Sequence, residues 1–404
     1  MISRFCLYGF LKNQQYYAPF IVLAFREKGL SFFLIGLLVT VREIVANLLE
    51  IPSGAVADLY GRRRAMLVSL ASYIACFLLL GFTYSLPLMV LAMALFGIGD
   101  AFRTGTHKAI IMDWLTHEGR FAEKTEVYGH TRSWSRLGSA VSAIVAALLV
   151  FKTGNYASIF YWTVIPYILG LFNIATYPAY LDGDKVAMAG EDDKGFISTI
   201  WSHLKETVTL IREGGVLQRL LGETMAWDGV YKAMKDYLQP LLKEAALAIP
   251  ILVTMAHSKR TSLLIGVVYC ILHLLESFAS KRSHKFAKRF TDEERAADGL
   301  WRIRTAAYIV LTIVLWYKRF YMAMFIFIVL GALHNLWRPI QVGRIQSHAP
   351  KEKSATILSV DAQSKALSTL LVAPLLGLAV DHWGLVSVGF CGVLACLFRA
   401  IIAR

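Results

Sequence analysis

Charged residues are scarce in this chain. Only 17% of its 404 residues are Asp, Glu, Lys or Arg, whereas 56% are hydrophobic and the mean hydropathy is +0.53. A soluble domain has roughly 45–50% apolar and about 25% charged residues. One or two soluble cores could not bury this much apolar surface, so the composition excludes a soluble globular protein.

Several chemical motifs are also missing. The five cysteines form no CxxC pair and no metal-ligand spacing, which excludes a disulfide framework and predicts no metal site. No GxxxxGK[ST] motif occurs, so ATP is not the direct source of energy. An intramembrane enzyme would need a catalytic constellation such as HExxH or GxSxG, and neither motif occurs in the sequence. A channel would be expected to show a filter-like segment. We therefore predict a non-enzymatic protein without a cofactor.

Long apolar stretches recur along the whole chain. They have the length of about 18 to 25 residues that a helix needs to cross about 30 Å of hydrocarbon. The amino-terminal residues contain no short apolar region followed by a cleavage site, so the first stretch is predicted to be retained as a helix. The twelve predicted spans are 4–25, 31–57, 65–84, 86–114, 131–152, 156–181, 216–242, 261–280, 302–317, 320–343, 354–380 and 384–402.

One connection, residues 182–215, is longer and more polar than the others. It is acidic at first and then amphipathic, with apolar residues at helical spacing from Phe196 to Ile211, as in a helix on a membrane surface. It divides the chain into an amino-terminal half (1–181) and a carboxy-terminal half (216–404). The predicted fold class is an all-α polytopic membrane protein with twelve transmembrane helices in two six-helix, pseudo-symmetric halves.

Lysine and arginine are concentrated in alternate loops. The loops after the even-numbered spans are basic, as in GRRR (61–64), whereas the opposite loops are short and poor in basic residues. Basic loops stay on the cytoplasmic side of a membrane, so both termini and the linker are predicted to be cytoplasmic. The formal charge of +14 is then a topology signal and not a nucleic-acid site. We expect a monomer in a bacterial inner membrane.

The segment LEIPSGAVADLYGRRRAM (49–66) joins the second and third spans on the basic side. Gly61 permits a tight reversal, and the arginines suit the headgroup region. Its spacing of Gly54, Asp58, Gly61, Arg62 and Arg63 resembles the loop motif of the major facilitator superfamily, Gly-x3-Asp-(Arg/Lys)-x-Gly-Arg-(Arg/Lys). Leu59 stands where that family usually has a basic residue. The resemblance implies the family's fold and a conformational role for the loop.

The second half repeats several spacings of the first. Nested repeats of this family place the substrate site near mid-membrane, at the repeat interface. The matched sets are Gly54-x3-Asp58-x2-Gly61 with Gly377-x3-Asp381-x2-Gly384, Tyr16-x2-Pro19 with Tyr237-x2-Pro240, and Arg132 and Arg136 with Asp361 and Lys365.

Many ionisable residues lie inside the predicted spans. A charge in lipid is costly, so such residues usually face a protein interior or an aqueous cavity. We predict a polar cavity in which one buried carboxylate carries a proton. The proton-coupling candidates are Glu43, Glu50, Asp100, Asp228 and Asp361. The candidates that line the cavity are Lys12, Asn13, Asn47, Arg103, His107, Arg132, Arg136, Lys232, Asn335, Arg338 and Lys365.

A structural interpretation of these charges stays open. Asp228 with Lys232, and Asp361 with Lys365, have the i, i+4 spacing of ion pairs that stabilise helices. His107 and His334 could titrate near neutral pH or could be hydrogen-bonded packing residues.

The predicted function is secondary active transport of a small solute by alternating access, coupled to protons. The basic residues among the cavity candidates favour an anionic or zwitterionic solute. One alternative is a proton-antiport multidrug efflux pump for cationic or amphipathic compounds. Family members of that kind carry a Gly- and Pro-rich fifth span, and residues 131–152 hold one glycine and no proline. Another alternative is a transport-dead receptor or scaffold on the same fold. The expected partners are the solute, protons and the lipid bilayer.

Overall fold

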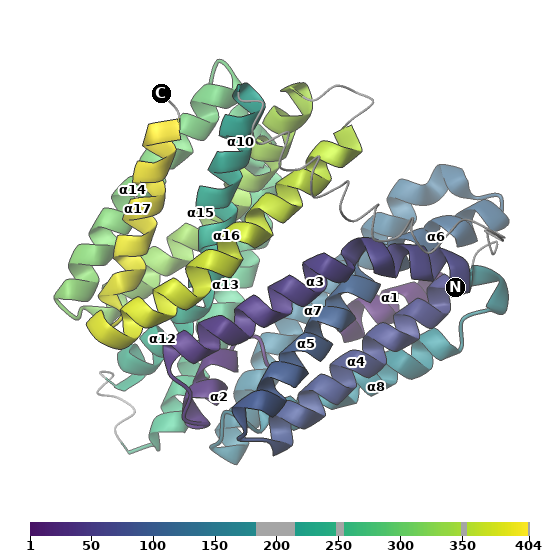
Figure 1. Ribbon diagram of the computed structural model, residues 1–404, viewed down its shortest axis with the longest axis horizontal. Coiled ribbons are helices and arrows are strands. Elements are labelled where there is room, and N and C mark those ends of the chain that lie inside the picture. Colours follow the sequence, from purple (N-terminus) through teal and green to yellow (C-terminus); the bar gives the residue numbers. More distant parts are fainter. Residues whose placement is uncertain (183–214, 248–253, 349–353, 403–404) are drawn as a thin grey trace. The chain divides into compact units, whose positions relative to one another are not determined.

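The structure is a computed structural model that describes residues 1–182, 215–247, 254–348 and 354–402 (Figure 1). These residues are helical almost throughout, and no strand occurs within these ranges. The predicted all-α class is confirmed. The amphipathic helix that we expect in the 182–215 linker lies outside the described residues.

The chain forms two compact units. The first comprises Met1–Phe20 and Val41–Ser202, and the second comprises Ile21–Thr40 and His203–Arg404. Helix α3 (Phe32–Tyr60) is therefore divided between the units near its middle. The predicted boundaries of the two halves, at residues 181 and 216, stay a prediction.

The first unit is a helical bundle in which α4 packs against α5 and α8, and α1 packs against α7 and α8. Glycines permit the close approach of α1 and α7, since a Cβ atom at Gly138 would lie 2.5 Å from the carbonyl oxygen of Phe10. Besides part of α3, the unit contains α1 (Ile2–Lys12), α4 (Arg62–Phe82), α5 (Leu86–Arg103), α6 (Thr106–His117), η1 (Phe121–Glu123), α7 (Lys124–Thr153), α8 (Ile159–Ala175) and η2 (Ala179–Asp182).

In the second unit, α15 packs against α13 and α14, and α17 packs against α14 and α16. The first residues of α3 belong to this unit, together with α2 (Ile21–Glu27), α10 (Val216–Thr224), η3 (Met225–Gly229), α11 (Val230–Met234), η4 (Lys235–Tyr237), α12 (Leu238–Leu247), α13 (His257–Ala287), α14 (Glu293–Trp316), α15 (Phe320–His348), α16 (Ser354–Trp383) and α17 (Val386–Ile402).

Each predicted span coincides with a helix or with a run of shorter helices. Among the described residues, eight helical segments are long and apolar enough to cross a membrane, and α8 and α17 are shorter apolar helices. The other two spans are interrupted. The first is broken between α1 and α2, and the seventh contains a π-helical turn (η3) and a 3₁₀ turn (η4).

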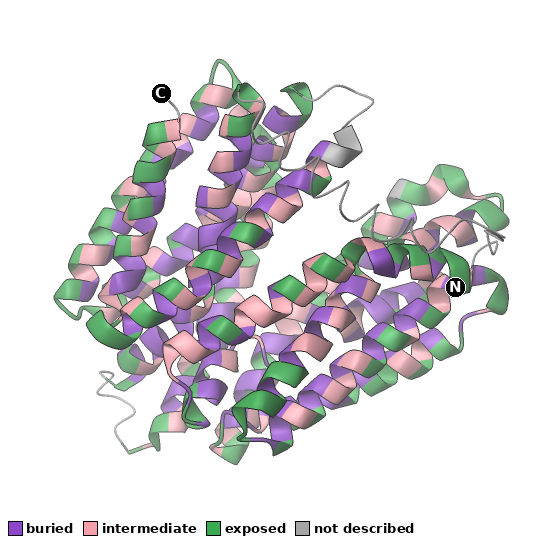
Figure 2. Ribbon diagram, viewed as in Figure 1, coloured by how far each residue is buried: buried purple, intermediate pink, exposed green. Residues whose placement is uncertain are grey.

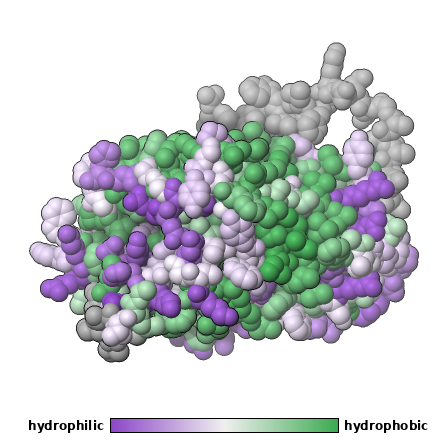
Figure 3. All heavy atoms as spheres, turned by 90° about the horizontal axis from the view of Figure 1, so that it is seen from below, coloured by the Kyte–Doolittle hydropathy of each residue, from purple (hydrophilic) through white to green (hydrophobic). Residues whose placement is uncertain are grey.

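Large hydrophobic side chains are exposed on both units. Leu148, Phe172, Phe325 and Leu394 are between 57% and 64% exposed. Figure 2 shows exposed and buried residues alternating along the helices, as on helices packed on one side only. Figure 3 shows hydrophobic residues gathered over broad areas of the surface. Such surfaces need lipid as their solvent, so the chain is an integral membrane protein.

Candidate functional site

Asp100 and Arg103 form the centre of a polar cluster in the first unit, at the end of α5. Arg103 donates to Asp100 through Nη2 (2.9 Å) and to the hydroxyl of Tyr73 on α4 through Nε (3.0 Å). The Tyr73 hydroxyl also hydrogen-bonds to the Asp100 carboxylate. Lys12 on α1 lies close enough to Arg103 and Asp100 to interact with them electrostatically. The α1, α4 and α5 helices thus bring two predicted cavity cations to one predicted carboxylate.

Glu43 on α3 is only 5% exposed and pairs with its neighbour Arg42, whose Nη2 lies 2.7 Å from Oε1. Asn47 donates to the backbone oxygen of Glu43 at 2.6 Å. Glu50, on the same predicted helix face, is exposed in its unit. We did not predict Arg42, although it is a charged residue inside a span, which is the signal that would have identified it.

Arg338 on α15 bridges two carboxylates in the second unit. Its Nη1 lies 3.0 Å from Asp228 and its Nη2 lies 2.5 Å from Asp361. Asp228 and Asp361 are 2% and 1% exposed, and Thr224 donates to Asp361 at 2.7 Å. Lys365 interacts electrostatically with Asp228. Three predicted site residues, distant in sequence, therefore share one buried charge cluster on η3, α15 and α16.

Each unit also stacks a histidine on a tyrosine. His107 lies on Tyr8 with ring centroids 4.0 Å apart, and His334 lies on Tyr231 with centroids 4.2 Å apart. The Nδ1 atom of His334 is 3.4 Å from Asp228. The first pair joins the first and fourth predicted spans, and the second pair joins the seventh and tenth. Equivalent spans of the two halves thus carry the same tyrosine–histidine pair. This pair is not among the matched spacings found in the sequence.

The other predicted cavity residues are more dispersed. Asn13 and Asn335 donate to the backbone oxygens four residues earlier in their helices, at 2.7 Å and 3.1 Å. Lys232 is partly buried on α11, whereas Arg132 and Arg136 are exposed on α7. Arg132 lies close enough to Lys12 to interact with it electrostatically, which connects α7 to the first charge cluster.

Arg304 on α14 is a buried site residue that we did not predict. It is 2% exposed, its guanidinium lies 4.1 Å from the ring centroid of Trp227, and it donates to the Tyr308 hydroxyl at 2.9 Å. Trp227 in turn stacks on Trp337 with centroids 4.6 Å apart. Arg304 lies inside the predicted span 302–317, so a charged residue within a span was again the signal that could have identified it as a site residue.

Several buried polar atoms near these clusters have no hydrogen-bond partner among the described residues. They include the Tyr8 hydroxyl, Nε1 of Trp337 and Nη1 of Arg304. Buried polar groups are usually hydrogen-bonded, so unpaired ones are candidates for contact with water or a solute. The two clusters can therefore offer both donors and acceptors. Among the described residues, no group of three or more His, Cys, Asp or Glu could hold a metal ion.

The predicted loop motif forms a salt-bridged turn in the first unit. Gly61 has φ +108°, a conformation that favours glycine. Arg62 donates to Asp58 (3.1 Å) and pairs with Asp113 on α6. Arg63 donates to the backbone oxygen of Tyr177 at 2.8 Å. The turn between α3 and α4 is thereby tied to α6 and to the residues after α8.

The glycines at the start of the two echoed motifs differ in their surroundings. A Cβ atom at Gly377 on α16 would lie 2.3 Å from the carbonyl oxygen of Phe32 on α3. A Cβ atom at Gly54 would have no described atom within 4 Å. The turn glycines do correspond, since Gly384 also has a positive φ, +76°.

Asp381, the echoed aspartate, caps the first turn of α3. Its Oδ1 accepts from the backbone N–H of Phe32 at 2.9 Å, and its Oδ2 accepts from that of Phe33 at 2.8 Å. A carboxylate at a helix amino terminus satisfies free N–H groups and complements the helix dipole. The second motif therefore joins α16 to α3 within the second unit.

Comparison with solved structures finds the same fold in several transporters. The nucleoside transporter NupG aligns with a TM-score of 0.72 at 11% identity, covering 100% of this chain and 96% of that one. The peptide transporter POT in complex with sulfate aligns with a TM-score of 0.70 at 14% identity, covering 100% and 93%. A D-xylose-proton symporter aligns with a TM-score of 0.63 at 14% identity, covering 98% and 95%.

Sequence comparison gives the family directly. A search of curated proteins finds no match. The profile of the Major Facilitator Superfamily matches residues 1–370, which is most of the chain. With the loop motif, the helical spans and the folds just described, this match confirms the predicted resemblance: the chain belongs to the Major Facilitator Superfamily.

Proposed function

We propose that this secondary transporter moves a small anionic or zwitterionic solute and couples its movement to protons. In this proposal the two predicted halves, 1–181 and 216–404, alternate in exposing a polar cavity to the two sides of the membrane. The termini lie in the cytoplasm, and the membrane is a bacterial inner membrane. The protein acts as a monomer.

The observation that carries the proposal is the position of Arg338 between Asp228 and Asp361, 3.0 Å and 2.5 Å away. Arg338 alone cannot neutralise both carboxylates, and a second positive charge near Asp228 is that of Lys365. A carboxylate of the solute would compete with one of the two aspartates for Arg338, because arginine binds carboxylates through two parallel hydrogen bonds. The aspartate that loses its cation in a buried site is stabilised by taking up a proton. Solute binding and protonation are then coupled.

The charge of the first unit supports the same class of solute. Lys12 and Arg103 lie close to each other, and Asp100 is the nearby carboxylate. The unpaired Tyr8 hydroxyl adds a hydrogen-bonding group in this unit. A solute with one carboxylate and further polar groups suits such a set better than a bulky cation.

The name of one similar structure agrees with a proton-coupled carrier, since that structure is a D-xylose-proton symporter. Another similar structure is a peptide transporter in complex with sulfate. Neither resemblance identifies the solute of this chain, because identities of 14% support the fold alone.

The test begins with a ligand screen of the purified protein. Solutes that bind the native state raise its melting temperature by mass action. Matched panels of anionic, zwitterionic, neutral and cationic solutes are compared at pH 6 and pH 8. The proposal expects stabilisation by anions or zwitterions, stronger at pH 6. Stabilisation confined to bulky cations, and stronger at pH 8, would favour drug efflux instead.

The second step measures coupling in proteoliposomes that contain a pH-sensitive dye. A solute from the screen should acidify the lumen when it is added outside. Asp361→Asn should abolish solute-driven acidification but retain solute exchange, because exchange needs no net proton movement. Asp298→Asn is the control, since Asp298 pairs with Arg399 and its side chain is 45% exposed. Each proton-coupling candidate is then replaced in turn by its matching amide, namely Asp361, Asp228 and Asp100 by asparagine and Glu43 and Glu50 by glutamine. If none of these variants changed the acidification, proton coupling through these residues would be refuted. Absence of any transport would favour the receptor alternative.

A further inference from the structure

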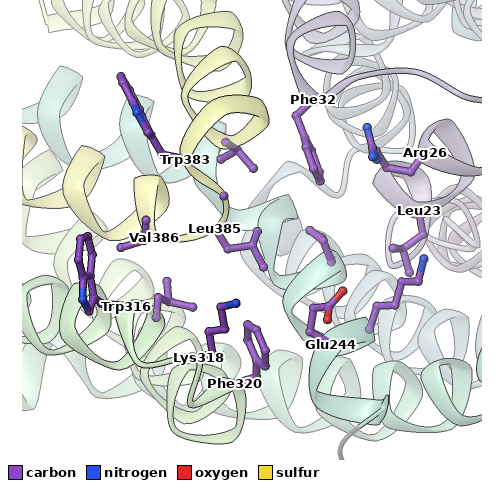
Figure 4. A pocket seen from close by; sticks show the side chains of 15 residues that line it. Leu23, Arg26, Phe32, Glu244, Trp316, Lys318, Phe320, Trp383, Leu385 and Val386 are labelled. Atoms are coloured by element: carbon purple, nitrogen blue, oxygen red, sulfur yellow. The ribbon is translucent and has the colours of Figure 1, made fainter.

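One end of the second unit holds a pocket of about 550 Å³. It lies between the α14–α15 turn, the α16–α17 turn and residues of α2, α3 and α12. Figure 4 shows Lys318 between Trp316 on one side and Glu244 on the other. Three basic side chains and one acidic side chain line the pocket, namely Arg26, Lys243, Lys318 and Glu244. This charge favours an anion.

Lys318 has an unusual backbone conformation. Within the described residues it is the only non-glycine residue with a positive φ, +55°. It follows the carboxy-terminal cap of α14, and the next N–H, of Arg319, donates to the carbonyl oxygen of Val314 at 2.9 Å. Glycine is the usual residue at such a helix end because it has no Cβ atom. The chain therefore has a lysine where the backbone favours glycine, and that lysine lines the pocket.

An apolar groove of about 1050 Å³ runs between α16 and α17. Its floor includes the buried Ala226 and Ala395, and its rim includes Leu375 and Leu394, each 64% exposed. The rim faces outward on a membrane-spanning part of the unit, so the groove opens toward lipid. The residues of α16 that line the groove extend from Ser368 to Trp383 at the end of the helix, about 22 Å at a rise of about 1.5 Å per residue. One leaflet contributes roughly 15 Å of hydrocarbon.

The pocket and the groove are continuous. Trp316, Trp383 and Val386 line both of them. Trp316 and Trp383 are 67% and 74% exposed, and tryptophans are enriched where a membrane protein crosses the lipid–water interface. The junction of a basic pocket with an apolar groove thus lies at the depth where a lipid headgroup meets its acyl chains.

We propose that this combined site binds one anionic phospholipid from the leaflet on the side of the α16–α17 turn. The phosphate lies in the basic pocket near Lys318, and an acyl chain lies in the α16–α17 groove. Basic pockets between transmembrane helices on the cytoplasmic side bind anionic lipid headgroups through their charge. By the predicted topology this pocket lies on the opposite side, where the same charge complementarity applies. Neither part of the site includes Asp228, Arg338 or Asp361, so the proposal does not depend on the transported solute.

Native mass spectrometry of the purified full chain tests the headgroup. Phosphatidylglycerol and phosphatidylcholine with identical acyl chains are titrated in one detergent. We expect one phosphatidylglycerol to be retained in preference to phosphatidylcholine. Lys318→Gln should weaken phosphatidylglycerol binding about fivefold, the equivalent of about 1 kcal/mol for one basic residue at a membrane surface. Arg319→Gln removes the neighbouring charge, which lies outside the pocket lining, and should leave phosphatidylglycerol binding unchanged. Lys318→Arg keeps the positive charge at position 318 and should bind phosphatidylglycerol as the wild type does.

A second pair of variants tests the acyl chain. Ala379→Phe places a ring in the groove, whereas Leu378→Phe places one on the adjacent lipid-facing position outside its lining. Only Ala379→Phe should weaken phosphatidylglycerol binding. A third titration uses glycerol phosphate, which has the headgroup charge without an acyl chain. We expect the protein not to retain glycerol phosphate.

Three results would overturn the proposal. Equal retention of the two lipids would exclude recognition of the anionic headgroup. Retention unaffected by Lys318→Gln would exclude this pocket. Retention of glycerol phosphate together with insensitivity to Ala379→Phe would identify a site for a soluble anion. Size-exclusion chromatography of each variant verifies that the fold is intact before the titrations are compared.

Discussion

At the scale of single residues, buried arginines organise the charges of the second unit. Arg344 is 1% exposed, with Nη1 2.6 Å from Glu223 and Nη2 2.6 Å from Glu294. Arg338 bridges its two aspartates in the same way, but its side chain is 28% exposed. The difference in exposure separates their roles. Arg344 is sealed among helices and stabilises the unit, whereas the partly exposed Arg338 is the one that we propose for solute binding.

Arg344→Met should destabilise the protein strongly. Glu223 is 0% exposed and, within the part of the chain that the structure describes, its remaining ion-pair partner would be Arg399, whose Nε is 3.5 Å away. Removing one partner of a buried ion pair typically costs about 3–5 kcal/mol. The apparent melting temperature in detergent measures the effect, with Arg295→Met as the control, since the Arg295 side chain is 69% exposed. Equal melting temperatures for Arg344→Met and the wild type would contradict the structural role.

Arg338→Lys should impair solute binding more than stability. Lysine keeps the positive charge but cannot make two parallel hydrogen bonds to a carboxylate. A hydrogen bond to a charged group contributes about 1.5–3 kcal/mol, so the affinity for an anionic solute should fall by about tenfold or more. Isothermal titration with a solute found in the stability screen measures this loss. An unchanged affinity would remove Arg338 from the binding site.

At the scale of helices, the contact between α3 and α16 depends on glycine and on one carboxylate. Gly377 brings the α16 backbone against Phe32, and Asp381 caps α3 one turn later. In the repeated sequence motif, Gly377 and Asp381 of α16 correspond to Gly54 and Asp58 of α3. One motif therefore builds a helix contact in this structure, and the other builds a salt-bridged turn.

Gly377→Ala and Gly54→Ala should have opposite effects on stability. The added Cβ atom at Gly377 would meet the Phe32 carbonyl at 2.3 Å, and overpacking of this kind costs about 1–3 kcal/mol. At Gly54 the added atom meets no described atom within 4 Å. Alanine in a helix interior is favoured over glycine by about 0.5–1 kcal/mol, so this variant should be slightly more stable. Melting temperatures of the two variants check the contrast, and equal shifts would contradict it.

Asp381→Ala should loosen the start of α3. Loss of an amino-terminal cap typically costs about 0.5–2 kcal/mol, and amide hydrogen exchange of a peptide containing Phe32 and Phe33 should accelerate. Asp381→Asn is the matched variant, because its amide oxygen can still accept one of the two hydrogen bonds. Exchange that is equally slow in Asp381→Ala and in the wild type would show that the cap does not stabilise this turn.

At the scale of the whole molecule, the two predicted halves carry matching features in equivalent spans. The first and seventh spans are both interrupted, and each contributes a tyrosine that stacks on a histidine from the fourth or tenth span. Discontinuous helices in corresponding positions of two repeats are a pointer to a transport site. These features mark the first and fourth spans in one unit, and the seventh and tenth spans in the other, as the parts of each unit that carry candidate site residues.

The predicted topology can be tested by chemical labelling. In a background without the five native cysteines, Lys288→Cys should react with an impermeant thiol reagent only from the cytoplasmic side. Lys318→Cys should react only from the opposite side, because one predicted span separates the two loops. Sealed vesicles of both orientations supply the comparison. Labelling of both positions from the same side would contradict the orientation inferred from the basic loops.

Much of the fold could be predicted because the relevant signals are local. Hydropathy over a span determines whether a segment crosses lipid, and the basic residues near Gly61 predict a cytoplasmic turn without knowledge of other segments. The interruptions of the first and seventh spans were less visible. Only the polar run at Lys12 and the prolines at 19 and 240 hinted at them, since a π-helical turn has no simple sequence pattern.

The partners within the site could not be predicted in this way. The chain by itself determined that charged residues lie inside spans, and it predicted a cavity to accommodate them. Only the tertiary structure decided that Arg338 joins Asp228 to Asp361, and that Arg42 and Arg304 belong beside the predicted residues. The physical reason is that these pairs are set by how helices pack. A shift of one residue in a helix turns its side chain by about 100°, from 3.6 residues per turn, and so changes every partner.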